Sequence, residues 1–195
     1  MIMNKIPKIL HVLFFVSFIL VSCQEAPVPK PRAFFRIALP EKHYIKFDSP
    51  FPYSFQYPEY AIVRLNPSSL SEPYWMNIYI PRFNANIHLS YKKIDNNLAS
   101  YLDDSHKLLT KQISKATGIR EDMIINTDAK VYGTIYNVKG SGVASPCQFF
   151  VTDSTRHFLR GALYFNVIPN NDSLAPIIDF LKEDIQYLLS TLTWN

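Results

Sequence analysis

Apolar and polar side chains follow strand-like patterns along several short stretches in the first half of the chain. The stretches are residues 53–58 (YSFQYP), 60–65 (YAIVRL), 75–80 (WMNIYI) and 86–91 (NIHLSY). An alternation with period two is typical of antiparallel strands that bury one face. PRFNA, between the last two stretches, fits a short hairpin connection, and residues 66–73 (NPSSLSEP) have the composition of a loop. This part of the chain therefore predicts an antiparallel sheet.

Two longer stretches carry apolar side chains at helical spacing. The first covers residues 98–117, with Asn97 as a possible N-cap and Gly118 as its stop. The second covers residues 174–192, with Pro176 placed in the first turn, where its missing N–H loses no hydrogen bond. The two apolar stripes are Leu98, Tyr101, Leu102, Leu109, Ile113 and Ala116, and then Leu174, Ile178, Leu181, Ile185, Leu188 and Leu192. The second stripe also fits a coiled-coil seam, but it is shorter than three heptads, so an amphipathic helix that covers a sheet is favoured.

Between the two helices, turn candidates separate apolar runs. The turns fall at residues 139–142, 152–155 and 170–172, which predicts three or four antiparallel strands in a meander. Their predicted core residues are Phe149, Val151, Phe158, Leu163, Phe165 and Val167. Strands, helix, strands and helix in this order predict an α+β domain over residues 33–195, an antiparallel sheet with two main helices packed on it. This order is broadly similar to the fold of the PsbP and Mog1 proteins, with no shared motif and no implied function.

The chain begins with a pattern typical of an export signal. Lys5 and Lys8 precede thirteen largely apolar residues, 9–21. A membrane-spanning helix needs about 20 such residues, so a cleaved signal over residues 1–22 is favoured over an anchor helix. Leu20-Val21-Ser22-Cys23 resembles a bacterial lipobox. The resemblance implies a diacylglycerol thioether on Cys23, cleavage just before it, and an acyl chain such as palmitate on the new amino terminus. The alternative is a chance cysteine near an ordinary cleavage site.

The chain has two cysteines, Cys23 and Cys147. If Cys23 carries lipid, Cys147 has no partner in its own chain; the alternative is a disulfide between the two. The surrounding sequence, ASPCQFFV, predicts that Cys147 begins a buried strand and behaves as a small apolar residue rather than a catalytic thiol. Three prolines between residues 24 and 32 predict that residues 23–32 form an extended tether after the lipidated cysteine, about 28 Å long at ~3.1 Å per residue.

Composition and charge exclude several classes of function. The 195 residues are 48% hydrophobic, and 20 Lys and Arg face 16 Asp and Glu without any run of like charge, which does not fit a nucleic-acid-binding protein. The five histidines show no metal-ligand spacing, and no nucleotide-binding motif occurs, so we expect no metal and no cofactor. Ser141, Asp153 and His157 could be drawn as a catalytic trio, but triads are recognised by geometry, and the chain is predicted not to be an enzyme.

The most distinctive stretch is residues 31–44, PRAFFRIALPEKHY, at the end of the predicted tether. Arg32, Phe34, Phe35 and Arg36 give it an aromatic and basic character. Such residues are enriched at interaction hot spots, so the stretch is a candidate docking segment. The alternative is an edge strand that opens the fold.

The lipobox, the proline tether, residues 29–44 and the YSFQYP strand together resemble the GldD family of gliding motility lipoproteins from Bacteroidetes. The resemblance implies a non-enzymatic envelope lipoprotein required for gliding and linked to type IX secretion, where it supports other motility lipoproteins. Only Cys23 is carried over as a site. The implied partners are the membrane, through the lipid, and other gliding and secretion lipoproteins and envelope proteins, with no nucleic acid and no small-molecule substrate.

The membrane that holds the anchor is predicted from the residues around Cys23. Gln24 stands where many inner-membrane lipoproteins carry Asp, and no acidic run follows the tether. We therefore expect the outer membrane, on its periplasmic face, with the inner membrane as the alternative. A second function also stays open, a periplasmic lipid-anchored binding module or chaperone, which a defined pocket would favour.

Overall fold

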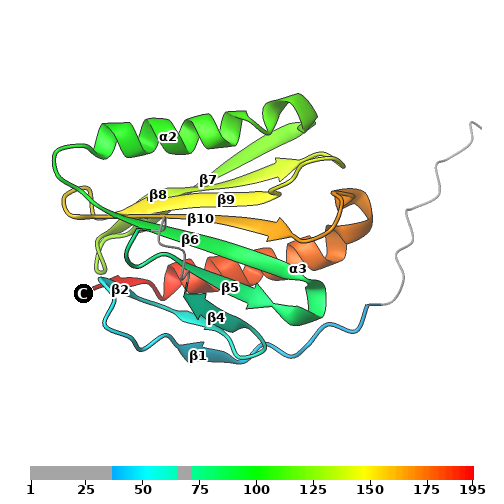
Figure 1. Cartoon of the computed structure of the whole chain (residues 1–195), viewed down its shortest axis with the longest axis horizontal. Helices are drawn as coiled ribbons and strands as arrows, with labels where there is room; N and C mark the ends of the chain where they lie inside the picture. Colours follow the sequence, from blue (N-terminus) through cyan, green and yellow to red (C-terminus); the bar gives the residue numbers. More distant parts are fainter. Residues whose placement is uncertain (1–36, 66–71) are drawn as a thin grey trace, which may run out of the picture. The chain divides into compact units, whose positions relative to one another are not determined.

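The computed structural model describes residues 37–65 and 72–195, all within one compact unit of residues 36–195. Its central feature is a seven-stranded antiparallel sheet in the order β4-β5-β6-β10-β9-β8-β7 (Figure 1). The strands are β4 (Ile62–Leu65), β5 (Met76–Ile80), β6 (Ala85–Lys93), β7 (Gly118–Asn126), β8 (Val131–Lys139), β9 (Cys147–Thr152) and β10 (His157–Phe165). The predicted α+β class, with two main helices on an antiparallel sheet, is confirmed.

The two helices, α2 (Leu98–Thr110) and α3 (Asn171–Ser190), lie on opposite faces of the sheet. Tyr101 of α2 contacts the ring of Phe158, whereas Leu181 of α3 belongs to the same buried cluster as Leu159. Consecutive strand residues point to opposite faces, so these two contacts place the helices on different sides. Short elements complete the fold: β1 (Tyr44–Lys46) pairs with β3 (Gln56–Pro58), β2 (Tyr53–Ser54) pairs with β11 (Thr193–Trp194), and 3-10 turns occupy Pro81–Phe83 (η1) and Ile113–Lys115 (η2).

The main hydrophobic core lies between α3 and the sheet. Its fully buried members include Phe55, Ile78, Ile87, Phe149, Leu163, Leu181 and Ile185. Phe149 stands directly opposite Gly161 on β10, and a Cβ atom at Gly161 would lie only 2.1 Å from Cζ of Phe149. The glycine therefore makes the space that the ring fills.

The opposite face is packed more lightly. α2 buries only Ser105 and Leu109, and Leu109 forms a small cluster with Val138 and Val143. The rest of this face carries polar and aromatic side chains rather than a continuous apolar core. The α2 side of the sheet is therefore where a solvent-accessible groove can form.

The predicted strands of the first half are confirmed. Residues 53–58 form two short strands, β2 and β3, instead of one, and these belong to two-stranded pairs outside the seven-stranded sheet, whereas β4 covers most of residues 60–65. β5 and β6 pair antiparallel across η1, as the hairpin reading of PRFNA predicts. Most of the predicted loop at residues 66–73 lies outside the described residues.

The first helix is shorter than predicted. It starts after Asn97 as expected but ends at Thr110, and Ile113, counted in the apolar stripe, is 54% exposed. Gly118 begins a strand, β7, instead of stopping a helix, and this strand contains the carboxylates Glu121 and Asp122. The strand was missed because it is an edge strand whose charged centre, residues 120–122, interrupts any apolar alternation.

The second helix starts earlier than predicted. It begins at Asn171, so the turn expected at residues 170–172 is wrong, and Pro176 lies inside the helix instead of in its first turn. Five of the six residues of the apolar stripe are buried, Ile178, Leu181, Ile185, Leu188 and Leu192, although Leu192 lies just beyond the end of α3; Leu174 is only partly buried.

Three strands of the predicted meander are confirmed as β8, β9 and β10, and four of its six predicted core residues are buried. These are Phe149, Val151, Phe158 and Leu163, each at most 3% exposed. Phe165 is only partly buried, and Val167 is 49% exposed because β10 ends before it.

Candidate functional site

The residues predicted to carry function lie outside the part of the chain that the structure describes. This holds for the lipidation site Cys23 and for Arg32, Phe34, Phe35 and Arg36 of the candidate docking segment. Their roles therefore stay predictions. Residues 37–44, the remaining part of the docking segment, are described, and they lead directly into a buried polar cluster.

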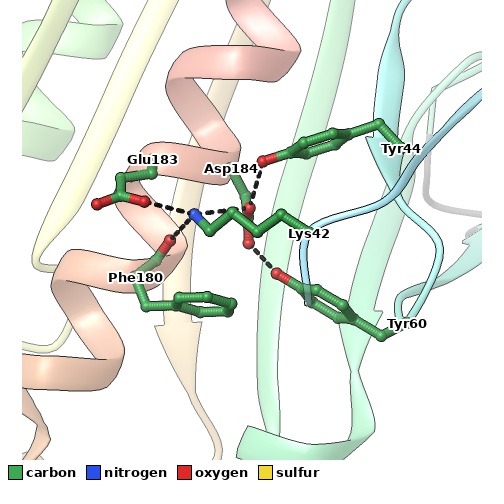
Figure 2. Close-up of polar contacts among 6 residues, drawn as sticks. All are labelled: Lys42, Tyr44, Tyr60, Phe180, Glu183 and Asp184. Carbon is green, nitrogen blue, oxygen red and sulfur yellow. Dashed lines mark hydrogen bonds and ion pairs between the residues drawn. The ribbon is translucent and has the colours of Figure 1, made fainter. Parts of the chain in front are cut away.

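The cluster centres on Asp184 of α3, whose side chain is 1% exposed (Figure 2). The ammonium group of Lys42 lies 3.1 Å from Oδ1 of Asp184. The hydroxyl of Tyr44 donates a hydrogen bond to the same oxygen at 2.9 Å, and the hydroxyl of Tyr60 donates to Oδ2. A buried carboxylate is tolerated only when it is paired and hydrogen-bonded, and here both of its oxygens are occupied.

Lys42 makes further contacts along α3. Its Nζ donates to the carbonyl oxygen of Phe180 at 3.0 Å and to Oε2 of Glu183 at 2.8 Å, and it lies 4.2 Å from the centroid of the Phe180 ring. These contacts hold the ammonium group in place. Lys42 thereby joins the described end of the docking segment to the middle of α3.

The tyrosines of the cluster act as hydrogen-bond donors. Burial, and then the hydrogen bond to Asp184, raise the pKa of Tyr44 and of Tyr60 well above the ordinary value. The ring of Tyr44 also stacks on Tyr187 at a centroid distance of 3.8 Å. With protonated phenols and a fully used carboxylate, the cluster is a structural fastening rather than an acid/base pair. We call it the Asp184 clamp, made of Lys42, Tyr44, Tyr60, Phe180, Glu183 and Asp184.

The sequence contained a signal for this cluster. Asp184 follows Leu181 by three residues and precedes Leu188 by four, so it falls on the buried stripe of the second helix. A carboxylate on an apolar stripe needs buried partners. The partners themselves, far away in the sequence, could not be identified without the structure.

A second candidate site is a groove of about 420 Å³ between α2 and the sheet. Strands β5, β6 and β10 form its floor, and α2 forms one wall. Its aromatic and apolar lining includes Trp75, Tyr101, Leu108 and Phe158, and its polar lining includes Ser105 and Arg160. The volume falls in the range of small-molecule pockets, about 300–1,000 Å³.

The polar groups of this groove are incompletely paired. Arg160 donates one hydrogen bond, 2.7 Å long, to Oε1 of Gln148. In residues 37–65 and 72–195, no carboxylate lies within ion-pair distance of Arg160. Desolvation lowers the pKa of its guanidinium. Within the same ranges, the hydroxyl of Ser105 is buried without a hydrogen-bond partner, and so is Nε2 of Gln148, a partner of Arg160 that does not itself line the groove.

The structure keeps the drawn catalytic trio apart. Ser141 lies in the loop before β9, whereas Asp153 and His157 lie at the turn after it, at the other end of the strand. Asp153 instead accepts hydrogen bonds from the backbone N–H groups of its own turn, and Nδ1 of His157 pairs with the hydroxyl of Tyr91 at 2.9 Å. These residues therefore stabilise a turn and a core edge.

Cys147 is buried at the start of β9, as predicted, and has no disulfide within the described part of the chain. Burial raises the pKa of its thiol to about 12. Among the described residues, no three His, Cys, Asp or Glu side chains converge in a way that could hold a metal ion. None of the described helices is both long and apolar enough to cross a membrane.

Comparison with known proteins gives one family match. The family described as gliding motility lipoprotein GldD matches residues 24–194, nearly the whole chain. Among curated proteins, none matches the sequence. The chain is similar to the solution structure of the cyanobacterial PsbP protein CyanoP from Synechocystis sp. PCC 6803, at 12% identity and a TM-score of 0.49, over 83% of this chain and 98% of that one. That likeness carries no functional argument.

Proposed function

The chain belongs to the GldD family of gliding motility lipoproteins, and from this membership we propose a specific role for it in the cell envelope. The role is that of a non-enzymatic, lipid-anchored accessory of the gliding and type IX secretion machinery. The single observation that carries the proposal is the family match over residues 24–194. That match begins directly after Cys23, where the mature lipoprotein is expected to start.

The anchor is assigned to Cys23. Its sulfur takes the diacylglycerol thioether, and the new amino terminus takes a further acyl chain. Two or more chains give lasting attachment, whereas one acyl chain alone binds a bilayer only marginally. We place the anchor in the outer membrane with the domain facing the periplasm, because Gln24 follows the cysteine; the inner membrane is the alternative.

The folded domain is assigned a supporting role toward other motility and secretion lipoproteins. The separation of Ser141 from Asp153 and His157 supports a role without catalysis by that trio. The Asp184 clamp supports a role in which the domain holds the docking segment in place, because it binds residues 42–44, the end of that segment, to α3. We propose that Arg32, Phe34, Phe35 and Arg36, which precede the clamp in the sequence, carry the docking.

A complementation experiment tests this function. In a gliding bacterium that carries the gene, deletion should abolish colony spreading and type IX secretion, and the intact gene should restore both. The Cys23→Ala variant should leave the membrane fraction and fail to restore spreading. Normal spreading and secretion in the deletion strain would disprove the proposal. Membrane fractionation and protease shaving of whole cells would then decide between the two membranes and faces.

The groove under α2 favours a second candidate function, a lipid-anchored binding module. Its volume and its incompletely paired Arg160 are features of a ligand site. A binding role and a motility role are compatible in one protein. They are tested by different readouts, binding in solution and spreading of cells.

A further inference from the structure

The sheet wall of the groove carries the positive charge of Arg160, which forms no ion pair with any described residue. Arg160 projects from β10 on the face that α2 covers, and it donates a hydrogen bond to the amide oxygen of Gln148, 2.7 Å away. The guanidinium also faces the phenol of Tyr164. A guanidinium has five N–H donors in a planar fork, so most of them have no strong acceptor among the described residues. A half-buried cation of this kind is stabilised by an anion.

The helix wall of the groove carries an unused hydrogen-bond group. Ser105 is 7% exposed, lines the groove, and its hydroxyl has no partner among the residues described. A buried hydroxyl without a hydrogen-bond partner destabilises the fold. Ser105 on α2 and Arg160 on β10 therefore present two unused polar groups to the same space from two sides.

The remaining charges of the groove limit what it can accept. Lys92 is paired with Glu72, so it is already neutralised. Burial lowers the pKa of His88 and so disfavours the charged form of its imidazole. Asp104 also lines the groove and repels a second negative charge. Arg160 thus remains the cation of the groove without an ion-pair partner among the described residues, and with Asp104 nearby this suits a monoanion better than a dianion.

The walls of the groove suit a flat apolar body. Tyr101 and Phe158 are in ring contact at a centroid distance of 5.5 Å, and Trp75 lies on the β5 side, with its Nε1 already bonded to the carbonyl of Tyr91. Aromatic faces of this kind bind rings by offset or edge-to-face contacts. The charged group and the apolar walls lie in one pocket of about 420 Å³.

We propose that this groove binds a small organic monoanion, a carboxylate joined to an aromatic or similar apolar body. The Arg160 fork holds the carboxylate, Ser105 donates a further hydrogen bond, and the rings of Trp75, Tyr101 and Phe158 hold the body. A planar carboxylate fits the fork in two parallel hydrogen bonds. This inference rests on the second candidate function, the binding module, and extends it by naming the class of ligand.

The experiment uses two probes that share a ring and differ in charge, 5-fluoroindole-3-acetate and 5-fluorotryptamine. Each is titrated against the purified full chain in non-ionic detergent micelles and followed by fluorine NMR, with protein-free micelles as the blank. We expect saturable binding of the acetate probe and at least tenfold weaker binding of the amine probe. Arg160→Gln should weaken binding of the acetate probe by about tenfold or more.

Two further variants control for folding and for charge. Ser105→Leu removes the unpaired hydroxyl and fills the groove, so it should abolish binding without lowering the melting temperature. Arg120→Gln removes an exposed arginine that is paired with Asp122 on β7, so it should leave the affinity unchanged.

Three results would overturn the ligand site. They are no saturable binding of the acetate probe at millimolar concentration, equal binding of the two probes, and unchanged binding in Arg160→Gln. Any of them leaves the motility role intact, because that role is read from spreading and secretion in the deletion and Cys23→Ala strains.

Discussion

The ammonium group of Lys42 lies 3.1 Å from the carboxylate of Asp184, and this pair fastens the described beginning of the chain to the middle of α3. Lys42 belongs to the stretch that most distinguishes the sequence, residues 31–44. Its contact gives the end of that stretch a structural role. The end of the candidate docking segment is therefore held on α3 by an ion pair whose carboxylate is buried.

Replacement of Lys42 should therefore destabilise the domain. Lys42→Met leaves the carboxylate of Asp184 buried with the phenols of Tyr44 and Tyr60 as its donors among the described residues. We expect a loss of about 1–3 kcal/mol in the free energy of unfolding, below the value for a fully buried pair because the Lys42 side chain is 23% exposed. Urea denaturation measures the loss. Lys46→Met, which changes an exposed lysine of β1, is the matched control, and equal stability of the two variants would contradict the clamp.

Gly161 and Phe149 should be coupled. Gly161→Ala places a Cβ atom 2.1 Å from the Phe149 ring, and such overpacking costs about 1–3 kcal/mol. Phe149→Leu removes the ring atoms involved, so the double variant should lose less stability than the sum of the two single losses. Thermal unfolding of the four proteins of this cycle gives the coupling. Additive losses would show that the ring can move away at no cost.

The structure shows why some features could be predicted from the sequence and others could not. The α3 stripe was predictable because Ile178 to Leu192 repeat with helical spacing on one buried face. Strand β7 was not predictable. It lies at the edge of the sheet, and its centre carries the charged residues Arg120, Glu121 and Asp122, which hide any strand-like alternation. The predicted end of the first helix was wrong because Ile113 fits the apolar spacing of the helix but lies exposed beyond its end at Thr110.

The candidate sites were harder to predict from the sequence than the fold, because their residues are far apart along the chain. Asp184 could be suspected from its place on the stripe, but Lys42, Tyr44 and Tyr60 meet it only through tertiary structure. The groove could not be predicted from the sequence, because Ser105 and Arg160 lie on separate elements and each looks like an ordinary surface residue. Unpaired polar groups are a property of packing, and no local pattern encodes them.

Ser105 offers a test of that packing. Ser105→Ala removes a buried hydroxyl without a described partner, so it should stabilise the domain by about 0.5–1.5 kcal/mol. Part of this gain is the helix propensity of alanine, and Ser100→Ala, at an exposed position of the same helix, measures that part alone. A larger rise in melting temperature for Ser105→Ala than for Ser100→Ala is the expected result. The reverse order would mean that the hydroxyl of Ser105 is satisfied in solution.

Asp153 should make the domain sensitive to acid. Partial burial would raise the pKa of Asp153, but backbone N–H groups of His157, Arg156 and Thr155 and the Thr155 hydroxyl outweigh it and lower the pKa to about 2. A lowered pKa means that the carboxylate stabilises the fold above pH 4. This contribution is lost as the pH falls from the ordinary value of 3.8 towards 2.

Asp153→Asn should remove that acid sensitivity. At pH 7 the variant should be less stable by about 1–2 kcal/mol, allowing for partial solvent exposure, and near pH 2 it should match the parent protein. Urea denaturation at a series of pH values measures both limits. Asp95→Asn, at an exposed turn, should leave the slope between pH 4 and 2 unchanged. A parent-like slope in Asp153→Asn would refute the assignment to this carboxylate.

Cys147 provides a test that joins the fold to the lipid anchor. Its thiol is fully buried, and burial raises its pKa to about 12, so the native protein should not react with iodoacetamide at pH 8. If Cys23 carries the thioether, unfolding in urea without reductant should expose one reactive thiol per chain, which mass spectrometry places at Cys147. A disulfide between Cys23 and Cys147 would instead leave no reactive thiol until a reductant is added. The number of reactive thiols in urea therefore decides whether Cys23 is bound to lipid or to Cys147 of the domain itself. Cys147→Val should keep the fold, with a loss in the free energy of unfolding below about 1.5 kcal/mol, because it exchanges one small apolar side chain for another of similar volume.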